Sequence, residues 1–137
     1  MTKIVAVVGA GAMGAGIAQV AAVAGHPVLV YDAVPGAAAA AIGKIRDRVA
    51  RRGHDPAALD LTGVPALEDL AGAQLVIEAI VEDLAVKRAL FEGLELMVPS
   101  ETILATNTSS LSPAAIAAGL QHPELTFRAS GRGFSVN

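Results

Sequence analysis

Three glycines near the N-terminus have the spacing of a phosphate-binding loop. Gly9, Gly11 and Gly14 fit the pattern G-x-G-x-x-G, after a β-branched apolar run and before a stretch of small apolar residues. In a chain with 14 glycines the pattern alone is weak, but its place between an expected strand and an expected helix makes it informative. The first glycine permits a tight turn, the second lets a pyrophosphate approach the backbone, and the third allows close packing of helix and strand. The free amides of the helix N-terminus would then face the phosphates of a dinucleotide.

An acidic residue stands at the expected end of the second strand. Asp32 follows Gly14 by 18 positions, close to the spacing at which a carboxylate binds the adenosine ribose of a dinucleotide. Its neighbours Ala33 and Val34 provide no cation for a 2′-phosphate. The two features together predict a site for NAD in preference to NADP. A simple turn-forming role for Asp32 before Pro35 is compatible with this one.

The expected elements that position these residues alternate between strands and helices. We expect strands at residues 3–8, 28–31, 61–64, 75–79 and 102–105, the third of them weak. We expect helices at residues 12–24, 35–52, 84–97 and 113–118, with a short helical piece at 67–70. Such alternation indicates a parallel sheet covered on both faces. The sequence therefore predicts an α/β protein, a doubly wound sheet of the Rossmann type with about five strands.

Composition excludes several classes of protein. The chain is 53% hydrophobic and 17% charged, so it is not intrinsically disordered. A net charge of −3 and 3% aromatic residues argue against a nucleic-acid partner. The absence of Cys excludes a disulfide scaffold, a zinc ribbon and a thiol nucleophile. The apolar residues 1–31 could be an export signal or a membrane anchor, but five glycines and a proline interrupt them, and we expect a cytoplasmic protein without a membrane partner.

Three segments together resemble a known family. They are GAGAMGAGIAQ at residues 9–19, IEAIVEDLAVK at 77–87 and TNTSSL at 106–111. In this order and spacing they are similar to the 3-hydroxyacyl-CoA dehydrogenases, which oxidise L-3-hydroxyacyl-CoA to 3-ketoacyl-CoA with NAD. The resemblance covers residues 1–124, which we take as an NAD-binding Rossmann domain.

The resemblance implies roles for residues that follow the fourth and fifth strands. It places Glu82 and Lys87 beside the cofactor, and it places Ser109 against the substrate near the nicotinamide, as the catalytic residue that this chain contains. No metal is implied. The complete set of expected cofactor-binding residues is Gly9, Gly11, Ala12, Met13, Gly14, Asp32, Ala79, Ile80, Glu82, Lys87, Asn107 and Ser109.

A purely structural interpretation of the same polar residues stays open. Glu82, Asp83 and Lys87 could be helix-end charges, with the acids at the positive N-terminus and paired with the lysine. The polar residues 107–110 could be a turn before a helix capped by Ser112.

Another part of the family pattern is missing. The family's general base is a His in a segment of the type G-L-H-F-F-N-P, and this chain has Ser130 at about that position. None of His26, His54 and His122 is a suitable substitute, because all three lie in expected turns. Residues 125–137 have no clear period and form an atypical tail, as in a truncated or frame-shifted product. We expect the chain to lack the family's helical C-terminal domain, with much of the acyl pocket and the dimer interface, and the connection at 53–61 looks shorter than is usual in the family.

We therefore interpret the chain as the NAD-binding domain of a 3-hydroxyacyl-CoA dehydrogenase of fatty-acid breakdown (β-oxidation) or related acyl-CoA breakdown. By itself it would lack the catalytic base. The family implies an acyl-CoA substrate and a homodimer formed through the missing domain. One alternative is a non-catalytic NAD-binding module, whose partner chain covers the sheet edge where a sixth strand would lie. Another is a related NAD-dependent dehydrogenase of hydroxy acids or sugar acids.

Overall fold

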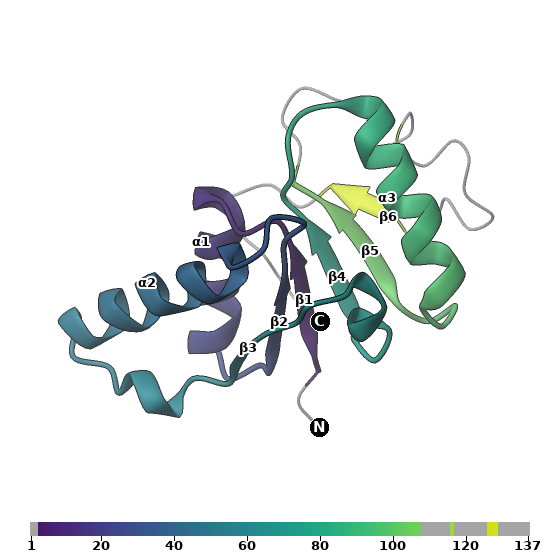
Figure 1. Ribbon diagram of the computed structural model, residues 1–137. Coiled ribbons are helices and arrows are strands. Elements are labelled where there is room, and N and C mark those ends of the chain that lie inside the picture. Colours follow the sequence, from purple (N-terminus) through teal and green to yellow (C-terminus); the bar gives the residue numbers. More distant parts are fainter. Residues whose placement is uncertain (1–2, 108–115, 117–125, 129–137) are drawn as a thin grey trace.

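The computed structural model describes residues 3–107, 116 and 126–128. Its sheet has six strands in the order β3-β2-β1-β4-β5-β6, and every neighbouring pair is parallel (Figure 1). The strands are β1 (Val5–Val8), β2 (Val28–Tyr31), β3 (Leu61–Gly63), β4 (Leu75–Glu78), β5 (Ile103–Thr106) and β6 (Thr126–Arg128). The helices are α1 (Ala12–Val23), α2 (Ala37–Arg51) and α3 (Leu84–Met97), with 3₁₀ turns η1 (Pro56–Ala58) and η2 (Leu67–Leu70). The predicted Rossmann-type sheet is confirmed.

The two faces of the sheet are covered by different helices. Helices α1 and α2 lie on one face and α3 lies on the other (Figure 1). Strand β1 shows the alternation, since Val5 and Val7 pack in the core cluster of α1 and α2 while Ala6 and Val8 pack in the cluster of α3. All four side chains are buried, which explains why this strand is a continuous apolar run rather than an alternating one.

The start of α2 differs from the prediction by two residues. We expected the helix to begin at Pro35, but it begins at Ala37. The residue between them, Gly36, has φ +82°, a left-handed conformation that a right-handed helix does not contain. Helix α3 and the turn η2 have the predicted bounds. No helix in the described part of the chain is long and apolar enough to cross a membrane.

The sheet has one strand more than predicted. Strand β6 pairs with β5, with Thr126 opposite Leu104 and Arg128 opposite Thr106. We predicted no strand after residue 124, because three residues are too few to show a hydrophobic period. Under the partner-chain alternative, another protein would cover the free edge of the fifth strand. In the structure, β6 of this chain pairs with that edge of β5. Of the helix expected at 113–118 only Ile116 lies within the described residues, and its side chain is buried in the α3 cluster.

Candidate functional site

The predicted site residues follow the carboxyl ends of four strands. Gly9 follows β1, Asp32 follows β2, Ala79 follows β4 and Asn107 follows β5. Because the strands are parallel, these four residues lie at one edge of the sheet. From β1 the chain moves to β2 on one side, and it returns to β4 on the other side. In open α/β sheets the ligand binds in the crevice at this reversal of strand order.

Gly9 and Gly14 have no room for a side chain. Gly9 has φ +110°, and a Cβ atom there would lie 2.5 Å from the carbonyl oxygen of Ala79. A Cβ atom on Gly14 would lie 1.7 Å from the carbonyl oxygen of Gly9. Both contacts are with backbone, which cannot rotate out of the way. This geometry agrees with a tight turn at the first glycine and close packing at the third.

Gly11 has the opposite surroundings. A Cβ atom on Gly11 would have no neighbour within 4 Å, and the residues after it, Ala12 and Met13, are exposed. Gly11 is the N-cap of α1, and no described side chain caps this helix. The first four N–H groups of a helix have no partner within the helix. The N-terminus of α1 therefore presents backbone donors, and the positive end of a helix dipole, toward open space.

Asp32 is held by backbone amides on both of its carboxylate oxygens. Oδ2 accepts a hydrogen bond from the N–H of Ala10 at 2.7 Å, and Oδ1 accepts one from the N–H of Val34 at 2.8 Å. The first bond connects the end of β2 to the glycine loop, a link that was not predicted. Each carboxylate oxygen can accept a further hydrogen bond, so the half-buried side chain keeps acceptor capacity for a ligand's hydroxyl groups.

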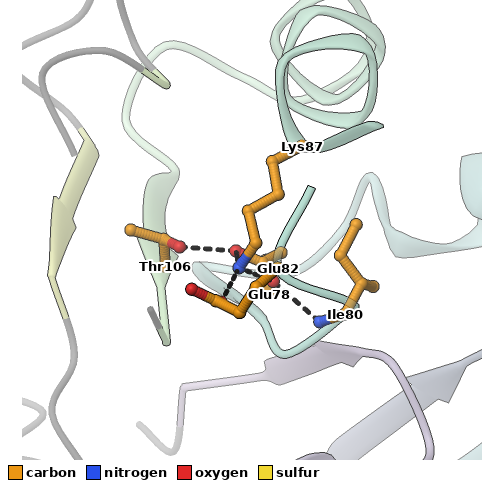
Figure 2. A network of polar contacts seen from close by, with 5 residues as sticks. All are labelled: Glu78, Ile80, Glu82, Lys87 and Thr106. Atoms are coloured by element: carbon orange, nitrogen blue, oxygen red, sulfur yellow. Dashed lines mark hydrogen bonds and ion pairs between the residues drawn. The ribbon is translucent and has the colours of Figure 1, made fainter. Parts of the chain in front are cut away.

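The turn from β4 to α3 is organised by charged side chains (Figure 2). The Nζ atom of Lys87 lies 3.0 and 2.8 Å from the two carboxylate oxygens of Glu78 and 2.8 Å from Oε1 of Glu82. Lys87 and Glu78 are fully buried, whereas the Glu82 side chain is 38% exposed. The structure thus brings the predicted residues Glu82 and Lys87 together, and it places Glu82 at the surface of the pair. The pairing expected under the structural interpretation is present.

The predictions missed Glu78 as a member of the site. Its carboxylate also accepts hydrogen bonds from the backbone N–H of Ile80, at 2.7 Å, and from the hydroxyl of Thr106. The sequence did contain a signal for Glu78, because it is an acidic residue at the end of an otherwise apolar, buried strand. A buried charge is costly unless it is paired, so this position calls for a cation nearby in the fold.

The remaining predicted residues lie around this network. Ala79 and Ile80 are half-buried in the turn, and Asn107 is half-buried after β5. The N–H of Asn107 donates to the backbone carbonyl of Glu78 at 2.8 Å. Ser109, the expected catalytic residue, lies outside the described residues.

Comparisons with known proteins identify the family of the chain. A model of the family described as 3-hydroxyacyl-CoA dehydrogenase, NAD binding domain, matches residues 4–129, five residues past the limit of the motif resemblance. A 3-hydroxyadipyl-CoA dehydrogenase of Escherichia coli K12 is 46% identical over 129 residues, 88% of this chain and 27% of that protein. A 3-hydroxybutyryl-CoA dehydrogenase of Mycobacterium tuberculosis is 41% identical over 132 residues, 88% of this chain and 46% of that protein.

Solved structures show the same fold. The crystal structure of a 3-hydroxybutyryl-CoA dehydrogenase from Escherichia coli K12 superimposes with a TM-score of 0.85 at 44% identity, covering 92% of this chain and 29% of that one. An (S)-3-hydroxybutyryl-CoA dehydrogenase from Ralstonia eutropha gives a TM-score of 0.87 at 28% identity, covering 93% of this chain and 48% of that one. The chain spans less than half the length of these relatives. This chain belongs to the family of 3-hydroxyacyl-CoA dehydrogenases, as their NAD-binding domain.

Proposed function

We propose that the carboxyl edge of the sheet binds NAD, as the cofactor-binding part of an enzyme that oxidises L-3-hydroxyacyl-CoA to 3-ketoacyl-CoA. The observation that carries the proposal is the uncapped N-terminus of α1, with open space over Gly11 and the Asp32 carboxylate tied to the same loop. A dinucleotide needs these two features together, a donor surface for its pyrophosphate and an acceptor for its ribose.

The residues fit NAD better than NADP. Asp32 is followed by Ala33 and Val34, neither of which could neutralise a 2′-phosphate. Its carboxylate would repel that phosphate across a short distance, with little screening in a half-buried position. The same carboxylate can accept hydrogen bonds from the ribose hydroxyls of NAD, because each oxygen keeps acceptor capacity.

Each site residue has a proposed task toward the cofactor. The amides around Gly11, Ala12 and Met13 would bind the pyrophosphate, and Asp32 would bind the adenosine ribose. Ala79, Ile80, Glu82 and Lys87 would form the β4 side of the crevice, with Lys87 acting through Glu82. Bound NAD would supply the hydride acceptor for the 3-carbon of the substrate. Following the family, Asn107 and Ser109 would lie toward the substrate, with Ser109 in contact with it.

We infer that the base for the hydroxyl proton comes from outside the described residues. His26 precedes β2 and its ring contacts the backbone carbonyl of Lys3, and His54 follows α2 and precedes β3. Both therefore lie toward the amino ends of the strands, opposite the edge where Gly9 and Asp32 lie. The third histidine, His122, lies outside the described residues, and the family pattern places the base a few residues after it, at about Ser130. We therefore expect the chain of 137 residues to bind cofactor without turning over 3-hydroxybutyryl-CoA.

The wider setting of the chain is proposed from its family. Relatives carry the names of 3-hydroxyadipyl-CoA and 3-hydroxybutyryl-CoA dehydrogenases, which supports an acyl-CoA substrate and a place in fatty-acid or related acyl-CoA breakdown. A homodimer formed through a helical domain is the assembly expected of the complete enzyme. The glycine-interrupted N-terminal segment supports a cytoplasmic location.

Calorimetric titration of the chain with NAD and NADP in parallel tests the proposal. Saturable binding of NAD, with NADP weaker by about tenfold or more, is the expected result; tenfold corresponds to about 1.4 kcal/mol. Equal affinity for the two cofactors would contradict the role of Asp32, and no binding of either would contradict the proposed function.

A further inference from the structure

We propose that Glu78 is a positioning residue of the cofactor site, which fixes the exposed carboxylate of Glu82 by way of Lys87. This inference rests on the proposed function, because it concerns how the same crevice is kept ready for NAD. Glu78 is buried and cannot touch a ligand, whereas Glu82 lies at the surface and can. The task of Glu78 is to hold Glu82 in place.

Glu78 connects three separate elements. It lies at the end of β4, and its carboxylate accepts hydrogen bonds from Lys87 on α3, from the hydroxyl of Thr106 on β5 and from the N–H of Ile80 in the turn (Figure 2). Four bonds in all reach its two oxygens, which matches the acceptor capacity of a carboxylate. Hydrogen bonds from three parts of the chain therefore fix the position of the Glu78 carboxylate, and this carboxylate anchors the turn.

Lys87 passes this position on to Glu82. Its ammonium group can donate three hydrogen bonds, and three carboxylate oxygens lie within 3.0 Å of Nζ, two from Glu78 and one from Glu82. With no exposed surface, Lys87 cannot contact a cofactor without giving up one of these partners. Glu82, at 38% exposure, is the member of the network that a ligand in the crevice can reach.

Stability alone does not explain why these charges are buried. Replacing a buried ion pair by apolar side chains of similar volume is often neutral or stabilising. Met at both positions would fill similar space without the cost of desolvating two charges. A buried pair whose cation also bonds an exposed carboxylate at the ligand edge is better explained by the orientation that it gives to that carboxylate.

The same carboxylate also shapes the turn next to the glycine loop. By accepting a hydrogen bond from the N–H of Ile80, it fixes the backbone of the turn directly after Ala79. The carbonyl oxygen of Ala79 is the atom that leaves no room for a side chain on Gly9, and the N–H of Ala79 donates to Val8 at the end of β1. Glu78 thus holds the backbone that leads to Glu82 beside the glycine loop, so the bond to Ile80 also acts on the cofactor through the position of Glu82.

A cycle of variants of the 137-residue chain separates positioning from stability. The paired change Glu78→Met with Lys87→Met removes both buried charges together, and Glu82→Gln removes the carboxylate through which they act. NADH affinity is measured by fluorescence titration for the unmodified chain, the pair, Glu82→Gln and the triple variant. Thermal unfolding is measured on each, and Glu92→Gln, an exposed change on α3, is the control for loss of a negative charge.

We expect the paired change to weaken NADH binding on the order of tenfold, as for loss of a charge-assisted contact, and Glu82→Gln to have a similar effect. In the Glu82→Gln background the paired change should add less than about twofold, because its route to the cofactor is gone. If the paired change weakened NADH binding by the same factor with Glu82 and with Gln at position 82, positioning through Glu82 would be contradicted. The proposed function would not be affected. No NADH binding by the unmodified chain would contradict the proposed function, and this role with it.

The variant with Met at both positions 78 and 87 could fail to fold, and a milder pair of variants then tests the same proposal. Thr106→Val removes one hydrogen bond to Glu78 at nearly constant volume, and Thr106→Ser keeps the hydroxyl. We expect the Val variant to weaken NADH binding about twofold to fivefold, as for loss of one hydrogen bond, and the Ser variant to restore the affinity. Restoration should disappear in the Glu82→Gln background. A Val variant with unchanged affinity, or a Ser rescue that persists without Glu82, would overturn the proposal.

Discussion

The turns β1–α1 and β4–α3 both join a strand to a helix at the carboxyl edge of the sheet, and they differ in what meets the N-terminus of the helix. Helix α1 begins after Gly11 with no capping side chain among the described residues. Helix α3 begins after Asp83, whose carboxylate accepts a hydrogen bond from the N–H of Val86 at 3.1 Å. The first turn leaves its backbone donors for a ligand, while the second uses a donor internally and presents the carboxylate of Glu82 instead.

The two turns are also kept in place by different forces. The β1–α1 turn depends on missing side chains, since a Cβ atom at Gly9 or Gly14 would collide with backbone. The β4–α3 turn depends on buried charges that satisfy one another, with Glu78 and Lys87 at its centre. Substitutions in the first turn should therefore act through steric clash, and those in the second through an unpaired charge.

The largest expected effect is that of Gly14→Ala. The added Cβ atom would lie 1.7 Å from the carbonyl oxygen of Gly9, and relief requires that the helix move away from the loop. We expect the free energy of unfolding to fall by about 5 kcal/mol or more, a loss seen only for changes that the structure cannot absorb. Gly16→Ala on the same helix, where a Cβ atom has open space, should instead stabilise by about 0.5–1 kcal/mol. Urea unfolding of both variants checks this. Similar changes in the free energy of unfolding for the two variants would show that helix propensity alone is involved.

Lys87→Met should be the next largest change. It leaves the carboxylate of Glu78 buried without its cation, which costs about 3–5 kcal/mol of stability when one partner of a buried pair is removed. Adding Glu78→Met should recover part of the loss, because no uncompensated charge remains, although the N–H of Ile80 and the hydroxyl of Thr106 lose their acceptor. Denaturant unfolding of the single and double variants measures the recovery. A double variant as unstable as the single one would mean that packing, rather than charge, holds this turn together.

Gly11→Val should separate binding from folding. Its backbone is extended, with φ −73° and ψ −170°, and a Cβ atom there meets nothing, so stability should fall by only about 1 kcal/mol, the cost of a poorer N-cap residue. The side chain would occupy the space through which the pyrophosphate approaches, and we expect NADH affinity to fall about a hundredfold, or about 2.7 kcal/mol. Fluorescence titration together with thermal unfolding tests both halves. Unchanged affinity would place the cofactor elsewhere.

Asp32→Asn should have the smallest effect, on cofactor preference. Asn keeps a side-chain oxygen that can accept one of the two backbone hydrogen bonds, but it removes the negative charge. The ratio of the affinity for NAD to the affinity for NADP should fall by about tenfold, or about 1.4 kcal/mol, mainly because the variant binds NADP more tightly. Calorimetry with both cofactors measures the ratio. If the preference for NAD persisted in full, charge repulsion at this position would not be its source.

The first turn was predictable from the sequence, and the second only in part. The task of Gly9, Gly11 and Gly14 depends on local spacing, which a sequence records directly, and the structure places them at a strand-to-helix turn as expected. The Asp83 N-cap likewise agrees with the predicted start of α3 at Leu84. Glu78 and Thr106 are 28 residues apart in sequence, and no local pattern shows that they meet.

The differences in the fold have similar physical causes. The left-handed Gly36 delays α2 by two residues, because a proline at a helix start does not by itself reveal the backbone angle of its neighbour. Strand β6 has three residues and owes its existence to pairing with β5, a tertiary contact that composition does not record. The sequence thus predicted the elements with a strong local pattern, and it missed those that depend on distant partners.

The most direct test of the cofactor site is a map of backbone amide shifts on addition of NAD to isotopically labelled chain. At 13.8 kDa the chain suits heteronuclear NMR. We expect the largest shifts at Gly11, Ala12 and Met13 and next to Asp32, with smaller ones in the turn at residues 79–82. Shifts centred instead on the hollow lined by Gln19, Val23 and His54, with the glycine loop unchanged, would contradict this expectation.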